Sequence, residues 1–294
     1  MRNLPNRKIT RFSTGELNTK ASKFLNEALY ILQGSFGEDL CSVILFGSHA
    51  SFQSTSISDI DLLVVLKDCV DSRTMGTITK HLTWLELSTG LVTPPRGLER
   101  ILRTIEVSTG MFICHFVCRR KDFITWRFSH VFSVSRIFAK LLAPGDLVQL
   151  GILASGITIT GENLLTKVFT AKISPRQIVK SFLMNSLQAM AALLIAPLSS
   201  KATIYSIEAV KWSLLSSFAY VNAKGMPVQD ALEFFRGKLH TGTFLALQLD
   251  KFMQLRESFH LSPAFVMKAP LTIFLVHKKA IQELKQRKKS DAGR

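Results

Sequence analysis

The hydrophobic pattern changes character part-way along the chain. Short apolar runs at 43–46 and 62–66 are rich in β-branched residues and have the length of buried strands. A similar run at 111–117 predicts a third strand. From Ser174 onward, apolar residues instead recur at helical spacing, and Ser174 followed by Pro175 is typical of a helix N-terminus. The pattern therefore predicts an α+β region followed by an all-α region.

Helical periodicity fills most of the remaining sequence. In the first region it predicts helices over 14–34, 72–87 and 123–142, with a short helix or a helix-to-strand passage over 98–105. In the second region it predicts five helices, over 175–196, 203–223, 228–236, 244–259 and 262–289. A chain of 294 residues favours two domains. We expect a basic arm at 1–13, a first domain at 14–170, a helical domain at 171–289 and a tail at 290–294.

The candidate chemistry lies between the first two predicted strands. Gly47 and Ser48 follow the first strand, where a residue without Cβ lets the backbone approach a ligand and a hydroxyl can donate to a phosphate oxygen. Asp59 and Asp61 are two residues apart, so both carboxylates are expected on one face of the second strand while Ile60 points into the core. Two carboxylates together with substrate phosphates suit Mg²⁺.

The arrangement G-S-x10-D-x-D between two apolar strands resembles the signature of the DNA polymerase beta superfamily of nucleotidyltransferases, in particular the minimal and antibiotic-type members with a helical C-terminal domain. The resemblance implies a small mixed sheet flanked by helices. It also implies transfer of a nucleoside monophosphate from an NTP such as ATP to an acceptor hydroxyl. Asp59 and Asp61 would be catalytic and would hold two Mg²⁺ ions, and Gly47, Ser48 and Ser58 would bind the nucleotide.

The third predicted strand departs from this family. Members normally carry a third carboxylate there, and its expected place is near Ile113, but 111–118 contains no acidic residue. Glu106, just before the strand, and His115, on it, are possible substitutes, and the absence of any third group is the remaining alternative. In the helical region, Glu208 is a weaker candidate for a base, since an i,i+3 pair with Lys211 also explains it.

The charge of the chain bears on its partners. Lys and Arg number 37 against 21 Asp and Glu, which gives a formal net charge of +16 and favours a polyanionic partner or substrate. RNA, another protein and a small hydroxylated molecule are all open as acceptors. The densest basic run, 277–289, suits contact with a phosphate backbone, or equally a solvated helix end.

The cysteines and the apolar runs bear on location. The four cysteines, in or beside apolar segments, suggest reduced, buried thiols, and the spacing of Cys114, His115 and Cys118 lacks the second ligand pair of a zinc site. No run reaches the roughly 18 uninterrupted apolar residues of a membrane span; 182–198 comes nearest. We expect a soluble, cytoplasmic protein with no membrane partner.

Two other functional classes remain open. The missing carboxylate and the positive charge are compatible with a nucleotidyltransferase fold that has lost catalysis and binds nucleotide or RNA. An antitoxin-like protein that modifies or neutralises a partner protein is the other alternative, by analogy with the family alone.

Overall fold

The computed structural model describes residues 19–55, 57–92, 99–110, 112–169 and 173–292. The chain divides into two compact units. Unit 1 comprises the described parts of Met1–Phe52, Asp59–Ala139 and Gly156–Phe169. Unit 2 comprises the described parts of Gln53–Ser58, Lys140–Ser155 and Thr170–Arg294. The expected N-terminal arm at 1–13, the expected domain boundary between 170 and 171, and the last two residues of the expected tail lie outside the described residues.

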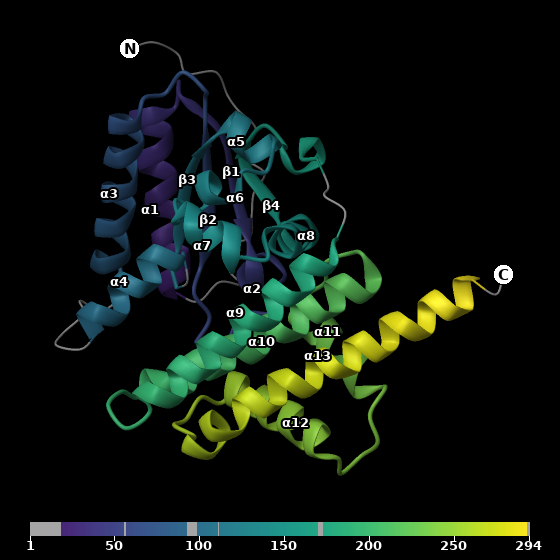
Figure 1. Ribbon diagram of the computed structural model, residues 1–294. Helices are drawn as coiled ribbons and strands as arrows, with labels where there is room; N and C mark the ends of the chain where they lie inside the picture. Colours follow the sequence, from purple (N-terminus) through teal and green to yellow (C-terminus); the bar gives the residue numbers. More distant parts are fainter. Residues whose placement is uncertain (1–18, 56, 93–98, 111, 170–172, 293–294) are drawn as a thin grey trace. The chain divides into compact units, whose positions relative to one another are not determined.

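Unit 1 is built on a four-stranded mixed sheet (Figure 1). The strands lie in the order β3-β2-β1-β4. β1 pairs antiparallel with both β2 and β4, whereas β2 pairs in parallel with β3. The parallel pair needs a long crossover, which α3 and α4 supply. The strands are β1 (Leu40–Phe46), β2 (Asp61–Leu66), β3 (His115–Arg119) and β4 (Ile157–Gly161), and the crossover helices are α3 (Ser72–Ser88) and α4 (Glu99–Thr109).

One face of this sheet packs against α1 (Thr19–Phe36) and α3, which lie side by side in Figure 1. Apolar residues at helical spacing on α1, such as Phe24, Ala28 and Leu32, are fully buried there. They form one core with alternate residues of β2, Leu62 and Val64 among them. This alternation directs the neighbouring residues of β2, including Asp61, to the opposite face.

The other face carries short helices and a cluster of aromatic rings. Where one helix was expected over 123–142, the chain forms α5 (Arg120–Ile124), α6 (Phe128–Val131) and α7 (Arg136–Leu141). Trp126 and Ser133 adopt left-handed φ values of 50° and 52°, which end the helical turns before them. The breaks let Phe132 contact Phe116 of β3 edge-on, with ring centroids 4.8 Å apart.

Unit 2 is helical, as expected. Its central helix, α10, packs against both α9 and α13 and buries most of its length. α8, earlier in the chain, also packs on α10. The α+β fold class with a following helical part is therefore confirmed. The helices are α8 (Gly145–Ser155), α9 (Pro175–Ile195), α10 (Lys201–Asn222), α11 (Val228–Arg236), α12 (Phe244–Glu257) and α13 (Pro263–Ala292).

One expectation about the apolar segments needs correction. All four cysteines are free, and Cys114 and Cys118 are buried, but Cys41 is half-buried and Cys69 is exposed, because Cys69 lies in the turn after β2 rather than in the sheet. Among the described helices, α9 is long and apolar enough to cross a membrane by length and composition alone. The sequence had placed that segment just below the limit.

A candidate active site at the β1–β2 hairpin

The two acids lie where β2 begins. Asp61 is the first residue of β2 and pairs in register with Phe46, the last residue of β1. Asp59 precedes the strand, and Ile60 between the two acids is fully buried in the core below the sheet. Both acids are half-buried. The burial of Ile60 turns the flanking carboxylates away from that core.

Gly47 lies directly against the carboxylate of Asp61. Its φ is +75°, a value that favours glycine. A Cβ built on Gly47 would fall well inside van der Waals distance of Asp61 Oδ2 and 3.1 Å from Asp61 Cγ. A glycine is therefore needed here for two reasons, the backbone conformation and the space that the carboxylate occupies. The structure brings together these two predicted site residues, which are 14 positions apart in the sequence.

The serines of the predicted nucleotide site have different surroundings. Ser48 is half-buried in the four-residue helix α2 (Gly47–Ala50). The hydroxyl of Ser51 donates to the carbonyl oxygens of Gly47 and Ser48, at 3.1 and 3.3 Å, and fixes this turn. Ser58 belongs to unit 2, where its Oγ accepts a hydrogen bond from the backbone N–H of Thr55 at 2.9 Å. Its hydroxyl thus closes a tight turn just before the acids.

Cys114 directly precedes β3, and its buried side chain belongs to the same core as Ile60 and Leu62. The backbone N–H of Leu62 donates to the carbonyl oxygen of Cys114 at 2.9 Å. Burial raises the pKa of the Cys114 thiol well above its usual value, and the negative charges of Glu86, Asp59 and Asp61 raise this pKa further. Three carboxylates therefore act on one buried thiol, and Glu86, on α3, was not among the predicted site residues.

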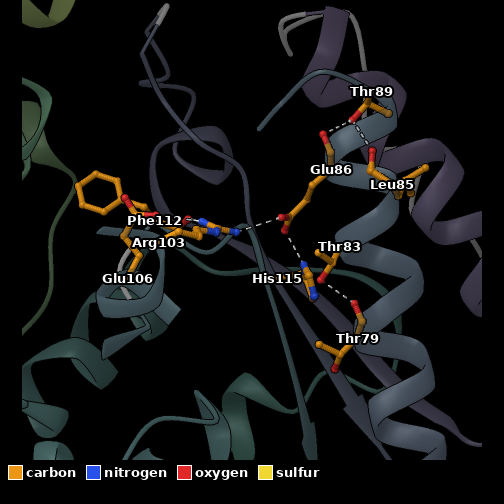
Figure 2. Close-up of polar contacts among 9 residues, drawn as sticks. All are labelled: Thr79, Thr83, Leu85, Glu86, Thr89, Arg103, Glu106, Phe112 and His115. Atoms are coloured by element: carbon orange, nitrogen blue, oxygen red, sulfur yellow. Dashed lines mark hydrogen bonds and ion pairs between the residues drawn. The ribbon is translucent and has the colours of Figure 1, made fainter. Parts of the chain in front are cut away.

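A chain of polar contacts runs from Glu86 to both substitutes proposed for the third carboxylate (Figure 2). Glu86 Oε1 lies 2.5 Å from Nδ1 of His115, and Glu86 Oε2 lies 3.8 Å from Nη2 of Arg103. Nη1 of Arg103 donates to Glu106 Oε2 at 3.2 Å and to the carbonyl oxygen of Phe112 at 3.0 Å. Glu106 and His115 thus lie at opposite ends of one network, with Arg103 and Glu86 between them.

Burial indicates what this network does. Glu86 is 1% exposed, His115 4% and Glu106 7%. Buried charges are stable only when they are paired, and Arg103 lies between the two glutamates and can neutralise their charge. The network ties α3 and α4 to the start of β3. None of its three buried members is open to solvent, so each is placed to position the hairpin rather than to meet a substrate.

Glu86 escaped the sequence analysis because a helical acid is usually solvated. A signal was nevertheless present. Ile78, Leu82 and Glu86 follow one another at intervals of four, which places the acid on the buried stripe of α3. A charged residue on an apolar stripe needs a partner, but that partner, His115, is 29 positions away and lies on a strand.

The side chains around Asp59 and Asp61 bear on whether Mg²⁺ can bind there. Within the part of the chain that the structure describes, no three His, Cys, Asp or Glu side chains converge as a ligand set. Mg²⁺ in nucleotide enzymes commonly takes one or two carboxylates and completes its shell with water and substrate phosphates. The Asp59–Asp61 pair matches that donor set, provided that the phosphates arrive with the ion.

Comparison with solved structures supplies the deciding observation on the fold. The spectinomycin adenyltransferase AAD(9) of Enterococcus faecialis, crystallised with ATP and spectinomycin, superimposes with a TM-score of 0.54. The match covers 89% of this chain and 98% of that enzyme, at 10% sequence identity. The chain shares the fold of this adenyltransferase. The fold that the hairpin resemblance implied is thereby confirmed, and the match extends over the helical part as well.

Sequence comparison agrees over a short segment. A relative from Methanocaldococcus jannaschii, named "Putative protein adenylyltransferase", is 45% identical over 47 residues. This segment amounts to 16% of the present chain, and the chain spans about a third of the relative's length, 32%. No protein-family model matches the chain. Both of these proteins are named for adenylyl transfer.

Proposed function

We propose that this protein is an enzyme that transfers a nucleoside monophosphate, with ATP as the first candidate donor, to an acceptor hydroxyl. The observation that carries the proposal is the contact between Gly47 and the Asp61 carboxylate, at the end of a hairpin that supplies a second acid, Asp59. The two relatives named for adenylyl transfer support the same chemistry. Four free cysteines favour a reducing compartment such as the cytoplasm.

Asp59 and Asp61 would hold Mg²⁺, with both of the expected ions sharing these two acids. Bound there, Mg²⁺ supplies charge neutralisation on the phosphates and orientation for in-line displacement. Because Gly47 has no side chain, the backbone lies close to Asp61 and leaves room for a triphosphate to approach the acids. The Ser48 hydroxyl is the nearest side-chain donor in sequence for a phosphate oxygen.

In the proposed reaction the acceptor oxygen forms a bond to the α-phosphorus. The bond from that phosphorus to the bridging oxygen breaks, and pyrophosphate leaves with the electron pair. The hydroxyl proton passes to solvent or to Asp59 or Asp61, because Glu86, Glu106 and His115 are buried in their own network. A general base typically contributes 10²- to 10⁴-fold in rate. We propose none apart from the two metal-binding acids, so we expect slow turnover.

The charge of the helical part constrains the acceptor. Residues 171–294 contain 18 Lys and Arg against 7 Asp and Glu, a formal net charge of +11. Such a surface repels a cationic acceptor, so an amine-bearing aminocyclitol such as spectinomycin is disfavoured. We propose an acceptor hydroxyl on an anionic molecule, with RNA first and an acidic protein surface second.

The test is transfer of label from ATP carrying a radioactive α-phosphate. The protein is incubated with Mg²⁺, the labelled ATP and either RNA with a free 3′-hydroxyl or a panel of acidic proteins. The wild type should label its acceptor, and Asp59→Asn/Asp61→Asn should lose about 1,000-fold in rate, because charge stabilisation by the metal supplies several kcal/mol.

The matched control is Glu38→Gln, which removes an exposed acid from the turn before β1. This variant should label at the wild-type rate. Equal labelling by the wild type and the double Asp variant would rule out the proposed mechanism. Unfolding curves of all three proteins separate a catalytic effect from a loss of folding.

A second candidate function is nucleotide or RNA binding without catalysis. The specific observation behind it is that the described residues 112–119, which lead into and form the third strand, include no acid. Calorimetry with ATP and Mg²⁺, alongside RNA binding measured against salt, distinguishes the two. Tight ATP binding without labelling of any acceptor would favour this candidate, and salt-independent RNA affinity would exclude its RNA version.

A further inference from the structure

The solvent face of α9 carries only apolar side chains after Arg176. The six large ones form a single stripe, and they fall into three pairs whose members are eleven residues apart. Eleven residues make three helical turns almost without drift, so the stripe runs straight along the helix. No charged residue occurs between Lys180 and Lys201. The stripe consists of Val179, Leu183, Leu187, Met190, Leu194 and, just past the helix end, Leu198.

α13 extends this stripe sideways within unit 2. Figure 1 shows α9 and α13 running side by side in opposite directions, and the rings of Phe182 and Phe274 lie 6.5 Å apart. Counted from this contact, Leu271 lies within about 3 Å of the level of Leu187 along the helix axes, and Met267 within about 2 Å of the level of Met190, because both helices rise about 1.5 Å per residue. Four exposed apolar side chains of α13 therefore border the stripe: Met267, Leu271, Phe274 and Ile281.

The combined surface, here called the α9/α13 face, is larger than an ordinary exposed patch. Its ten apolar side chains are between 39% and 74% exposed. Together they present roughly 1,000 Å² of apolar surface, against about 300–600 Å² for the largest patch on a typical monomer. A standard protein interface buries about 800 Å² on each partner. The area is thus sufficient for a stable, mainly apolar interface.

We propose that the α9/α13 face binds the same face of a second copy of this chain, about a two-fold axis. Such an interface is isologous and would close a four-helix layer from two helices of each protomer. The α9 part of the face has the composition of an interface core, rich in Leu and Met and free of charge from 181 to 200. On α13 the exposed Lys268 and Lys278 lie among the apolar side chains, a feature that also suits a lipid surface, so the test below separates lipid from a second copy.

The position of the lysines on α13 is compatible with this symmetry. Lys278 and Lys285 are exposed towards the C-terminal end of α13 and would repel their counterparts if the two copies ran parallel. An axis that passes near Leu187 and Leu271 sends the two Lys285 side chains in opposite directions. Each Lys285 lies fourteen residues from Leu271, so the two Lys285 residues are about 40 Å apart along the helices. This distance is far beyond the Debye length of about 8 Å.

The test is the mass of the full chain in solution, measured by light scattering during gel filtration. The wild type should have about twice the monomer mass of 32.8 kDa. Leu187→Glu/Leu194→Glu should give monomers, because each copy would bring charges into the apolar centre. Tyr30→Glu, which charges an 82% exposed position on α1, is the matched control and should remain dimeric.

A second variant removes any dependence on how well the charged protein folds. Leu187→Cys in a Cys69→Ser background places a new thiol close to the proposed axis and removes the exposed natural one. Mild oxidation should link two chains through residue 187, whereas Tyr30→Cys in the same background should stay unlinked. The cross-link forms only if the two faces meet.

A monomeric wild type at about 100 μM, or a charged double variant that stays dimeric, would overturn the proposal. Co-sedimentation with phosphatidylglycerol vesicles by a monomeric wild type, lost in Leu187→Glu/Leu194→Glu, would also overturn it and would assign the face to lipid. A dimer that cross-links at residue 187 and ignores vesicles would support it.

Discussion

Gly47 leaves no room for a Cβ beside Asp61: the added carbon would stand 3.1 Å from the carboxylate carbon and closer still to Oδ2. The geometry of the proposed metal ligand thus depends on a residue that has no side chain. The pairing of Asp61 with Phe46 fixes the backbone of Asp61, and the nearby backbone of Gly47 limits the position of its carboxylate.

We expect Gly47→Ala to remove nearly all nucleotidyl transfer. The new Cβ displaces the Asp61 carboxylate, and a shift of about 1 Å at a catalytic group can cost about 100-fold in rate. The left-handed φ of +75° adds about 1–2 kcal/mol of strain. Gly76→Ala is the control, since a Cβ on this glycine of α3 meets nothing within 4 Å. It should keep full activity and gain up to about 1 kcal/mol in stability.

Glu86→Ala should strongly destabilise the protein. The change leaves the guanidinium of Arg103 without one of its two acids and buries an unpaired His115 nitrogen. Breaking such a buried pair costs about 3–5 kcal/mol, measured as the free energy of unfolding in urea. Glu27→Ala, at a 45% exposed side chain that lies 3.9 Å from Lys23, should change stability by less than about 0.5 kcal/mol. Equal effects of the two substitutions would contradict the role given to the network.

His277 should make unit 2 less stable in mild acid. Burial between Tyr220 and Phe182 lowers the pKa of His277 from 6.5 to about 4, so the unfolded chain binds the proton more readily than the folded one. Stability contributed by the neutral ring is complete above pH 6.5 and is lost as the pH falls towards 4. We expect a loss of about 2 kcal/mol between pH 7 and pH 4.5.

The measurement for His277 is urea unfolding at the two pH values. His277→Gln keeps a hydrogen-bonding group for the Tyr220 hydroxyl but does not titrate, and its loss between the two pH values should be smaller by the same amount. His81→Gln, at an exposed histidine of α3, should retain the wild-type difference. An unchanged pH dependence in His277→Gln would show that another group is responsible.

The thiols should react in an order set by exposure and pKa. Cys69 is exposed and should react first with a disulfide reagent such as Ellman's. Burial raises the pKa of both Cys114 and Cys118, so these two should react only after unfolding. Cys69→Ser should remove the fast phase alone. A fast phase that persists in this variant would place another thiol at the surface.

The sequence was sufficient to predict the hairpin and the helical part because their signals are local. Apolar runs of strand length, a Gly-Ser pair and helical periodicity are each contained within a few residues, and the observed elements follow them closely. The third strand begins at His115 rather than at 111, since the pairing of His115 with Leu62 sets its start and cannot be seen in the run itself.

The errors concern features that depend on distant residues. The helix expected over 123–142 breaks at Trp126 and Ser133, neither of which is a residue that favours a left-handed conformation, because aromatic packing on the sheet overrides local propensity. Glu86 was missed because its partners are supplied by β3 and α4. A charged residue on a buried helical stripe, such as Glu86, is itself the signal of a distant partner.

β1 and β2 hold the two inner positions of the sheet, with β3 and β4 outside them. Opening of either outer strand therefore leaves the Gly47–Asp61 geometry intact, and the backbone amides of Val43 and Val64 should exchange with deuterium only when the whole unit opens. The β1–β2 hairpin is therefore the rigid part of unit 1, and any movement that accompanies the proposed transfer must come from elsewhere in the chain.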